Sequence, residues 1–402
     1  MDLDLGDPIQ FLTHFTRIAQ EHDPDLGAEI LQRAFERNLE AFALPALDVA
    51  VETGDPVGKV LASSLCRKGL PSLLSSIQSR CLSPGYEHSV PLREVALVTA
   101  EAEVAKQRSQ VTTTSTGGHA RLAHALMGLS ARLGDLDAHQ QAFEASREAV
   151  EITAGLFAET PEESRYDHVL CLTNLGGDLR ELGRFDEALE VCEEALRHAR
   201  HLVADQPEFF RDDLAIALSN LAAIQHELGI YDRELENQHE AIEHFRALID
   251  HSPDQFRSQF SDSLNSLGTA LDEQGEFEAA ACAYEEASGH YRQLSADRPD
   301  SFRSDLARNC SDLGSLLSKL GRHDEALGLA AEAVHLFRGL TEQRPETFRK
   351  GLAGSLHTAG ILLSEVGLRE EAVLAAREAV DLHRRLFADR PSASRSDLVA
   401  AL

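Results

Sequence analysis

The stretch SFRSDLARNCSDLGSLLSKLG, residues 301–321, decides the fold of this chain. Its apolar side chains recur three or four residues apart, at Leu306, Cys310, Leu313, Leu317 and Leu320. That spacing places them on one face of an α-helix. Glycine is common just past a helix C-terminus, so we expect the helix to stop at Gly321.

The residues that follow, RHDEALGLAAEAVHLFRGLTEQRP at 322–345, predict a second amphipathic helix. Ala326, Ala330 and Ala333 share one of its faces, and small side chains allow two helices to approach closely. Proline cannot continue a helical hydrogen-bond ladder, so we expect Pro345 to end the unit. The two stretches together predict a helical hairpin.

This hairpin pattern repeats with a period of 46 residues. Proline recurs at that interval at Pro161, Pro207, Pro253, Pro299, Pro345 and Pro391, and glycine at Gly183, Gly229, Gly275, Gly321 and Gly367. Such self-similarity is the signature of stacked repeats. An earlier hairpin is less regular, because Gly134 precedes Gly183 by 49 residues. We therefore expect about three extra residues in or after its turn.

The repeats resemble the tetratricopeptide repeat (TPR) family, in the long form seen in bacterial and kinesin-light-chain-like arrays. The residues that carry the resemblance are Leu175, Gly176, Leu179, Gly183 and Ala188, with Ala195 seven residues later. The resemblance implies an all-α fold, a right-handed α-solenoid of about six TPR-like hairpins over residues 119–390. Glu234 departs from the pattern, because the other hairpins have alanine at its position.

Three further segments flank or precede the solenoid. Residues 1–108 lie outside the period but show helical spacing, so they predict an N-terminal helical module that acts as a cap or a docking domain. The segment 109–118, SQVTTTSTGG, is interpreted as a flexible loop. Residues 391–402 predict a partial or capping helix.

The formal net charge of the chain is −29, which bounds the choice of partner. Binding to nucleic acid or to an anionic membrane requires a basic face, so we expect neither. A basic or neutral protein partner fits this charge. The N-terminus is acidic and the six cysteines show no CxxC pair, which favours a cytoplasmic protein with reduced thiols. The oligomeric state is left open.

The sequence contains no recognisable catalytic, cofactor or metal-binding motif. No nucleophile with a matching base and no glycine-rich phosphate loop is found, so we expect neither enzyme activity nor a cofactor. His198 and His201 lie three residues apart, next to Arg197 and Arg200. A metal site there needs carboxylate or thiolate neighbours, so we interpret both histidines as solvent-facing.

In TPR proteins the first helix of each hairpin lines a concave groove, and the resemblance implies the same arrangement here. The side chains expected to bind a peptide in that groove are Thr173, Asn174, Arg180, Ser219, Asn220, His226, Asn265, Thr269, Arg308, Asp312 and Lys319. Amide side chains donate and accept at once, so a ladder of them suits a peptide backbone. The alternative is that the same groups only satisfy neighbouring helices.

These features predict a non-enzymatic scaffold that binds a peptide or protein segment in the TPR groove. A second hypothesis rests on the resemblance alone: a regulatory or sensor subunit that controls a separate effector enzyme, such as a caspase-like protease, through the N-terminal module.

Overall fold

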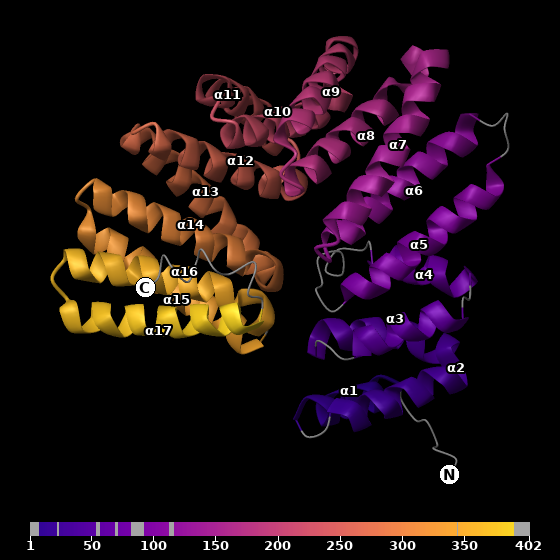
Figure 1. Cartoon of the computed structure of the whole chain (residues 1–402), viewed down its shortest axis with the longest axis horizontal. Helices are drawn as coiled ribbons and strands as arrows, with labels where there is room; N and C mark the ends of the chain where they lie inside the picture. The colour runs from indigo at the N-terminus through magenta and orange to yellow at the C-terminus, as the bar shows by residue number, and fades with distance from the viewer. Residues whose placement is uncertain are drawn as a thin grey trace. The chain divides into compact units, whose positions relative to one another are not determined.

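The computed structural model describes residues 8–21, 24–53, 57–68, 71–81, 92–111, 116–343 and 345–389. Seventeen α-helices, and no strand, account for the secondary structure of these residues (Figure 1). The predicted all-α solenoid of TPR-like hairpins is therefore confirmed. Contacts divide the chain into two units, residues 1–205 and residues 206–402.

The first five helices of unit 1 share a hydrophobic core of their own. They are α1 (Pro8–Glu21), α2 (Pro24–Thr53), α3 (Val57–Lys68), α4 (Pro71–Cys81) and α5 (Arg93–Gln110). Phe35, Phe42 and Leu61 are among the fully buried side chains of this core. Asn38 leaves the helical conformation with φ −150° and ψ 76°, which bends α2 in its middle. The helices expected in residues 1–108 are present, while their role as a cap or docking domain stays a prediction.

The remaining helices form six hairpins, two in unit 1 and four in unit 2. Unit 1 contains α6 (Thr116–Gly134) with α7 (His139–Glu159), and α8 (Pro161–Glu181) with α9 (Phe185–Asp205). Unit 2 contains α10 (Pro207–Glu227) with α11 (Tyr231–Ile249), α12 (Pro253–Glu273) with α13 (Phe277–Asp297), α14 (Pro299–Lys319) with α15 (His323–Gln343), and α16 (Pro345–Glu365) with α17 (Arg369–Asp389).

The periodic prolines open helices rather than close them. Pro161, Pro207, Pro253 and Pro299 each lie in the first turn of the first helix of a hairpin. Proline suits this place because its missing N–H has no intrahelical acceptor there, and its fixed φ is already helical. The expectation that Pro345 ends a unit is thus corrected, because it is the first residue of α16.

The periodic glycines end the first helices in the left-handed conformation, with φ between 70° and 86°. At Gly183 the backbone N–H donates to Arg180 O, and the N–H of Arg184 donates to Leu179 O. This pair of bonds is the Schellman motif, which favours glycine because a Cβ is disfavoured at positive φ.

The hairpin α6–α7 keeps the same period, which corrects the expected insertion after Gly134. Asp137 lies 46 residues before Gly183 and has φ 59°. Its N–H donates to Gly134 O, and the N–H of Ala138 donates to Leu133 O, so the same motif closes the turn. No residues are inserted. Gly134 is an ordinary helical position, and an aspartate, one of the few residues tolerated there, takes the left-handed place.

Small residues bring the two helices of a hairpin together, as the sequence indicates. Ala326, Ala330 and Ala333 of α15 are 0–2% exposed.

The segment 109–118, predicted as a loop, is helical in part, because α5 extends to Gln110 and α6 begins at Thr116. Residues 112–115 and the predicted helix at 391–402 lie outside the described residues.

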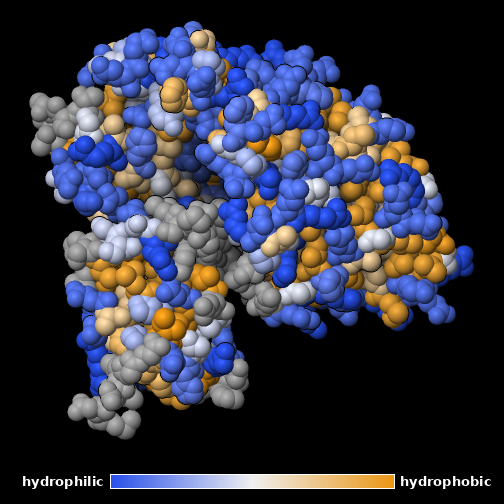
Figure 2. All heavy atoms as spheres, turned by 180° about the vertical axis from the view of Figure 1, so that it is seen from behind, coloured by the Kyte–Doolittle hydropathy of each residue, from blue (hydrophilic) through white to orange (hydrophobic). Residues whose placement is uncertain are grey.

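The visible face of the molecule in Figure 2 is largely hydrophilic, with apolar residues in scattered patches. Among the described helices, none combines the length and the apolar character that a membrane crossing requires.

Candidate functional site

The first helices of unit 2 lie next to one another, since α10 contacts α12, α12 contacts α14 and α14 contacts α16. Asp305, Arg308 and Asp312 recur at spacings of three and four on one face of α14. Asp262 holds in α12 the repeat position that Arg308 holds in α14. We call these four residues the acidic face.

Three carboxyl groups on the acidic face share one guanidinium group. Arg308 Nη1 lies 3.4 Å from Asp305 Oδ1, and its side chain stays 65% exposed. Partial removal from water raises the pKa of Asp305 and that of Asp312 to about 6, although Arg308 opposes the shift in both. The same loss of hydration raises the pKa of Asp262, whose Oδ1 accepts a hydrogen bond of 2.6 Å from Tyr291.

A fourth carboxyl group of the same kind lies on α10. Asp213 holds the repeat position of Asp305, two hairpins earlier. Its pKa is raised to about 7, mainly by loss of hydration and to a smaller extent by repulsion from Asp212. The first helices of unit 2 therefore present carboxylates that their own chain neutralises only in part, which favours binding of positive charge.

The predicted polar ladder bonds along the first helices themselves. Ser219 Oγ lies 3.0 Å from Ser263 Oγ, and Ser311 Oγ lies 2.9 Å from Ser355 Oγ. Between these pairs, Asn309 Nδ2 donates to Asn265 Oδ1 at 2.9 Å. Each bond joins residues 44 apart on successive first helices. In unit 1, Asn174 Nδ2 donates to Ser130 Oγ at 3.1 Å.

These contacts are those expected if the ladder serves neighbouring helices. Peptide binding by the same groups stays a prediction. The side chain of Asn220, which is half-buried, makes no hydrogen bond within the described part of the chain.

The other predicted groove residues also have partners on this chain. Thr173 Oγ1 donates to Val169 O, Arg180 pairs with Glu181, and Thr269 Oγ1 lies 3.0 Å from Tyr284 Oη. Lys319 Nζ contacts both carboxylate oxygens of Asp272 at 2.7 Å, so its charge is already matched. Unit 2 contains two of the predicted basic groove residues, Arg308 and Lys319, and the side chain of Arg308 is the more exposed of them.

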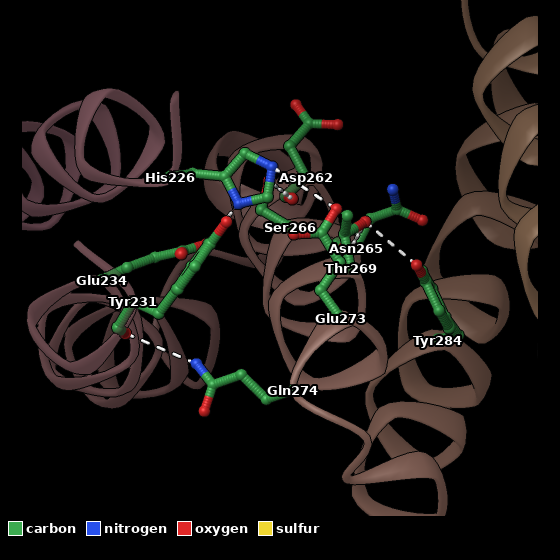
Figure 3. Close-up of polar contacts among 10 residues, drawn as sticks. All are labelled: His226, Tyr231, Glu234, Asp262, Asn265, Ser266, Thr269, Glu273, Gln274 and Tyr284. Atoms are coloured by element: carbon green, nitrogen blue, oxygen red, sulfur yellow. Dashed lines mark hydrogen bonds and ion pairs between the residues drawn. The ribbon is translucent and has the colours of Figure 1, made fainter. Parts of the chain in front are cut away.

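Glu234, the departure noted in the sequence, belongs to a buried polar cluster between α10 and α11. It is 4% exposed, and its Oε1 lies 3.0 Å from His226 Nδ1 (Figure 3). His226 Nε2 lies 3.7 Å from Oε1 of Glu273 on α12. Burial raises the pKa of Glu234, and the nearby His226 opposes that shift. The pair of Glu234 and His226 thus takes the place of the alanine found in the other hairpins. Through Glu273 on α12 it extends to the next hairpin.

Sequence reasoning missed a second group, in unit 1. His198 is half-buried rather than solvent-facing, whereas His201 is exposed. Glu194 lies one turn before His198 on α9, and His168 of α8 completes the group. The carboxylate neighbour whose absence excluded a metal site is therefore present. The Glu194–His198 spacing of four residues is visible in the sequence, but the approach of His168 depends on the hairpin.

Comparison with known proteins identifies the repeats. The model of the family described as Tetratricopeptide repeat matches residues 169–208 and 352–391. No curated protein matches the chain in sequence. The predicted resemblance to the tetratricopeptide repeat family is confirmed by this match, which covers these two segments of the chain.

Solved structures support the same fold. BtubC (BKLC) from P. vanneervenii has a TM-score of 0.50 at 18% identity, with 62% of this chain and 92% of that chain covered. The apo form of RapI has a TM-score of 0.51 at 15% identity, with 75% and 96% covered. A signal transduction ATPase from Pyrococcus horikoshii with a tetratricopeptide repeat sensor has a TM-score of 0.54 at 12% identity. The match covers 98% of this chain and 56% of that protein.

Proposed function

We propose that this tetratricopeptide-repeat protein is a non-enzymatic interaction scaffold, and that the first helices of unit 2 bind a partner segment rich in lysine or arginine. The observation that carries the proposal is the acidic face, where the charge of a single guanidinium group, that of Arg308, acts on Asp262, Asp305 and Asp312. TPR repeats are generally built as binding surfaces, which supports a protein or peptide partner.

The chemistry of the acidic face selects the partner's charge. A lysine or arginine side chain from a partner supplies the positive charge that Arg308 alone does not, and charge-assisted hydrogen bonds are about twice as strong as neutral ones. Asp305 and Asp312 are already partly removed from water, so they lose less hydration on binding a partner than fully exposed carboxylates do. The formal net charge of −29 attracts such a segment at long range and repels nucleic acid and anionic membranes.

The proposal is tested by selecting peptides against the purified full chain. We expect enrichment of lysine and arginine, with affinities in the micromolar range that is common for mobile peptides (about 1–100 µM). The triple variant D262N/D305N/D312N should weaken binding about tenfold or more. The control E236Q/E243Q/E278Q removes the same charge from exposed sites on α11 and α13 and should stay within about threefold.

Two outcomes would contradict the proposal. One is a selection with no basic preference. The other is an equal loss of affinity in both triple variants, which would show a general charge effect and no site.

The regulatory hypothesis is a second candidate. It is supported by one of the similar structures, in which tetratricopeptide repeats are described as the sensor of a signalling ATPase. In this case the effector contacts the helices α1–α5, and the acidic face reads a ligand. Cross-linking of the full chain to a candidate effector separates the two functions, because only the regulator predicts cross-links within residues 8–110.

A further inference from the structure

Three potential metal ligands converge between helices α8 and α9 of unit 1. Glu194 and His198 lie four residues apart on α9 and therefore share one face. Glu194 Oε1 lies 3.8 Å from His198 Nε2 and 3.9 Å from Nε2 of His168 on α8. One ligand atom from each of the three residues lies within 4.8 Å of the others. His168 is buried and the other two are half-buried.

We propose that His168, Glu194 and His198 bind a divalent transition-metal ion with Zn²⁺-like ligand preference. Two imidazoles and one carboxylate are ligands that zinc and its neighbours accept, and three protein ligands leave one position for water. Around a tetrahedral zinc with bonds of 2.0–2.1 Å, ligand atoms lie about 3.4 Å apart. To reach that spacing, the two carboxylate–imidazole distances shorten by about 0.4–0.5 Å, and the distance between the two imidazole nitrogens shortens by at most about 1.4 Å.

A neighbouring threonine prepares His168 to be a ligand. Thr153 Oγ1 lies 3.1 Å from Ala149 O and uses its proton there, so it accepts the Nδ1–H of His168 at 3.0 Å. The proton of the neutral ring is then on Nδ1, and the lone pair of Nε2 faces Glu194. Metal-bound histidines are commonly held in this way, with the second ring nitrogen donating to a fixed acceptor.

An aromatic ring fixes both imidazoles from the other side. Phe157 stacks on His168 with 5.3 Å between ring centroids and meets His198 edge-on at 4.9 Å. Arg165 lies over the ring of Phe157 and pairs with Glu162 at 3.1 Å, which offsets part of its charge.

Mutual hydrogen bonding does not explain this group. The two nitrogen–oxygen distances of 3.8 and 3.9 Å exceed the 2.7–3.2 Å of a hydrogen bond. Nδ1 of His198 is also buried without a partner within the described residues. A central ion accounts for a carboxylate that faces two imidazole nitrogens without bonding to either.

The test is a calorimetric titration of the chelator-stripped full chain with Zn²⁺, repeated with Co²⁺ and followed by absorption. Cys66 and Cys282 are exposed thiols, so the titration uses a C66S/C282S background. We expect one ion bound with a Kd of about 10 µM or tighter. H198A and E194Q should each weaken binding about 100-fold. H201A, an exposed histidine on the same helix, is the matched control and should bind as the background does.

Metal-dependent stability provides the second readout. Saturating Zn²⁺ should raise the thermal midpoint of the background chain and of H201A, but not that of H198A or E194Q. Circular dichroism in the absence of metal confirms that the variants are folded. The proposal is overturned if the background chain binds no Zn²⁺ more tightly than about 1 mM. It is also overturned if H198A and E194Q both bind as tightly as H201A.

Discussion

The hairpins α10–α11 and α12–α13 share one backbone design but close it with different chemistry. In α12–α13 the closing residues are mostly apolar or small, whereas in α10–α11 several of the same repeat positions are polar. The corresponding residues, 46 apart, are Ala222 and Gly268, Gln225 and Leu271, Glu234 and Ala280, and Gln238 and Tyr284. Each of these pairs except the first exchanges a polar side chain for an apolar or aromatic one.

The difference shows how side-chain volume is redistributed within a fixed hairpin. A Cβ added to Gly268 would lie 2.8 Å from the ring of Tyr284, so the large ring requires glycine on the facing helix. In α10–α11 the corresponding positions hold the smaller Gln238 and an alanine, Ala222. The polar hairpin is less completely satisfied, because Glu234 Oε2 and Gln238 Oε1 are buried without partners in the described structure. Tyr284 bonds Thr269.

The largest effect is expected for Gly268→Ala, which gives α12–α13 the small residue of its neighbour while keeping the ring. The added methyl group overpacks against the buried ring of Tyr284, and such changes cost about 1–3 kcal/mol. Chemical denaturation of the full chain measures this. Gly289→Ala on α13 is the control, because its Cβ meets nothing within 4 Å, and it should stabilise by up to about 1 kcal/mol. Equal effects of the two substitutions would refute the packing argument.

The substitution Glu234→Gln removes the charge from the polar hairpin. We expect it to change the free energy of unfolding relative to the wild type by a smaller amount, about 1–2 kcal/mol. Because burial raises the pKa of Glu234, the folded chain holds this proton more tightly than the unfolded chain. The corresponding stability is present at low pH and is lost as the pH rises through the folded-state pKa. The variant should therefore gain stability relative to the wild type as the pH rises from about 4 to 8.

Denaturation at a series of pH values tests this expectation for Glu234. Glu236→Gln, on the exposed surface of the same helix, is the control and should follow the wild-type curve. A wild-type chain that gains stability over Glu234→Gln with rising pH would reverse the sign and contradict the assignment.

The smallest effect concerns the bonds between the first helices. Asn309, which is fully buried, donates to Asn265 and also to Tyr284 O, whereas the preceding contact is the pair Ser219–Ser263. Asn265→Ser and Asn309→Ser together convert one kind of contact into the other. A double-mutant cycle should give a coupling of about 0.5–1 kcal/mol, with the double variant more stable than additivity predicts. A coupling near zero would mean that the two amides act independently.

Much of the fold was accessible from the sequence because it repeats. Five glycines and six prolines in register predict hairpins without any knowledge of contacts, and the described helices follow the five glycines and the prolines from Pro161 to Pro345 closely. Gly134 misled this reasoning. Residue type pointed to a glycine as the turn, whereas the backbone places Asp137 there, at the true period.

The sites were less predictable, because they depend on which helices meet. Arg308 and Asp312 were predicted as groove residues from the resemblance to TPR proteins, but Asp262 and Tyr291 join them only through packing between elements. The pairing of His226 with Glu234 spans a turn of the chain, and its burial is a property of the folded hairpin. Hydrogen bonds of the predicted ladder likewise depend on the offset between successive first helices.

Hydrogen–deuterium exchange of the full chain, with and without a selected lysine-rich peptide at pH 7.5, tests the central claim most directly. We expect the peptide to protect the backbone of α12 and α14 around Asp262, Asp305 and Asp312, and the protection to fade at pH 5, where Asp305 and Asp312, each with a pKa of about 6, take up protons. Protection confined to the second helices α13 and α15, or undiminished at pH 5, would contradict the assignment of the acidic face as the binding surface.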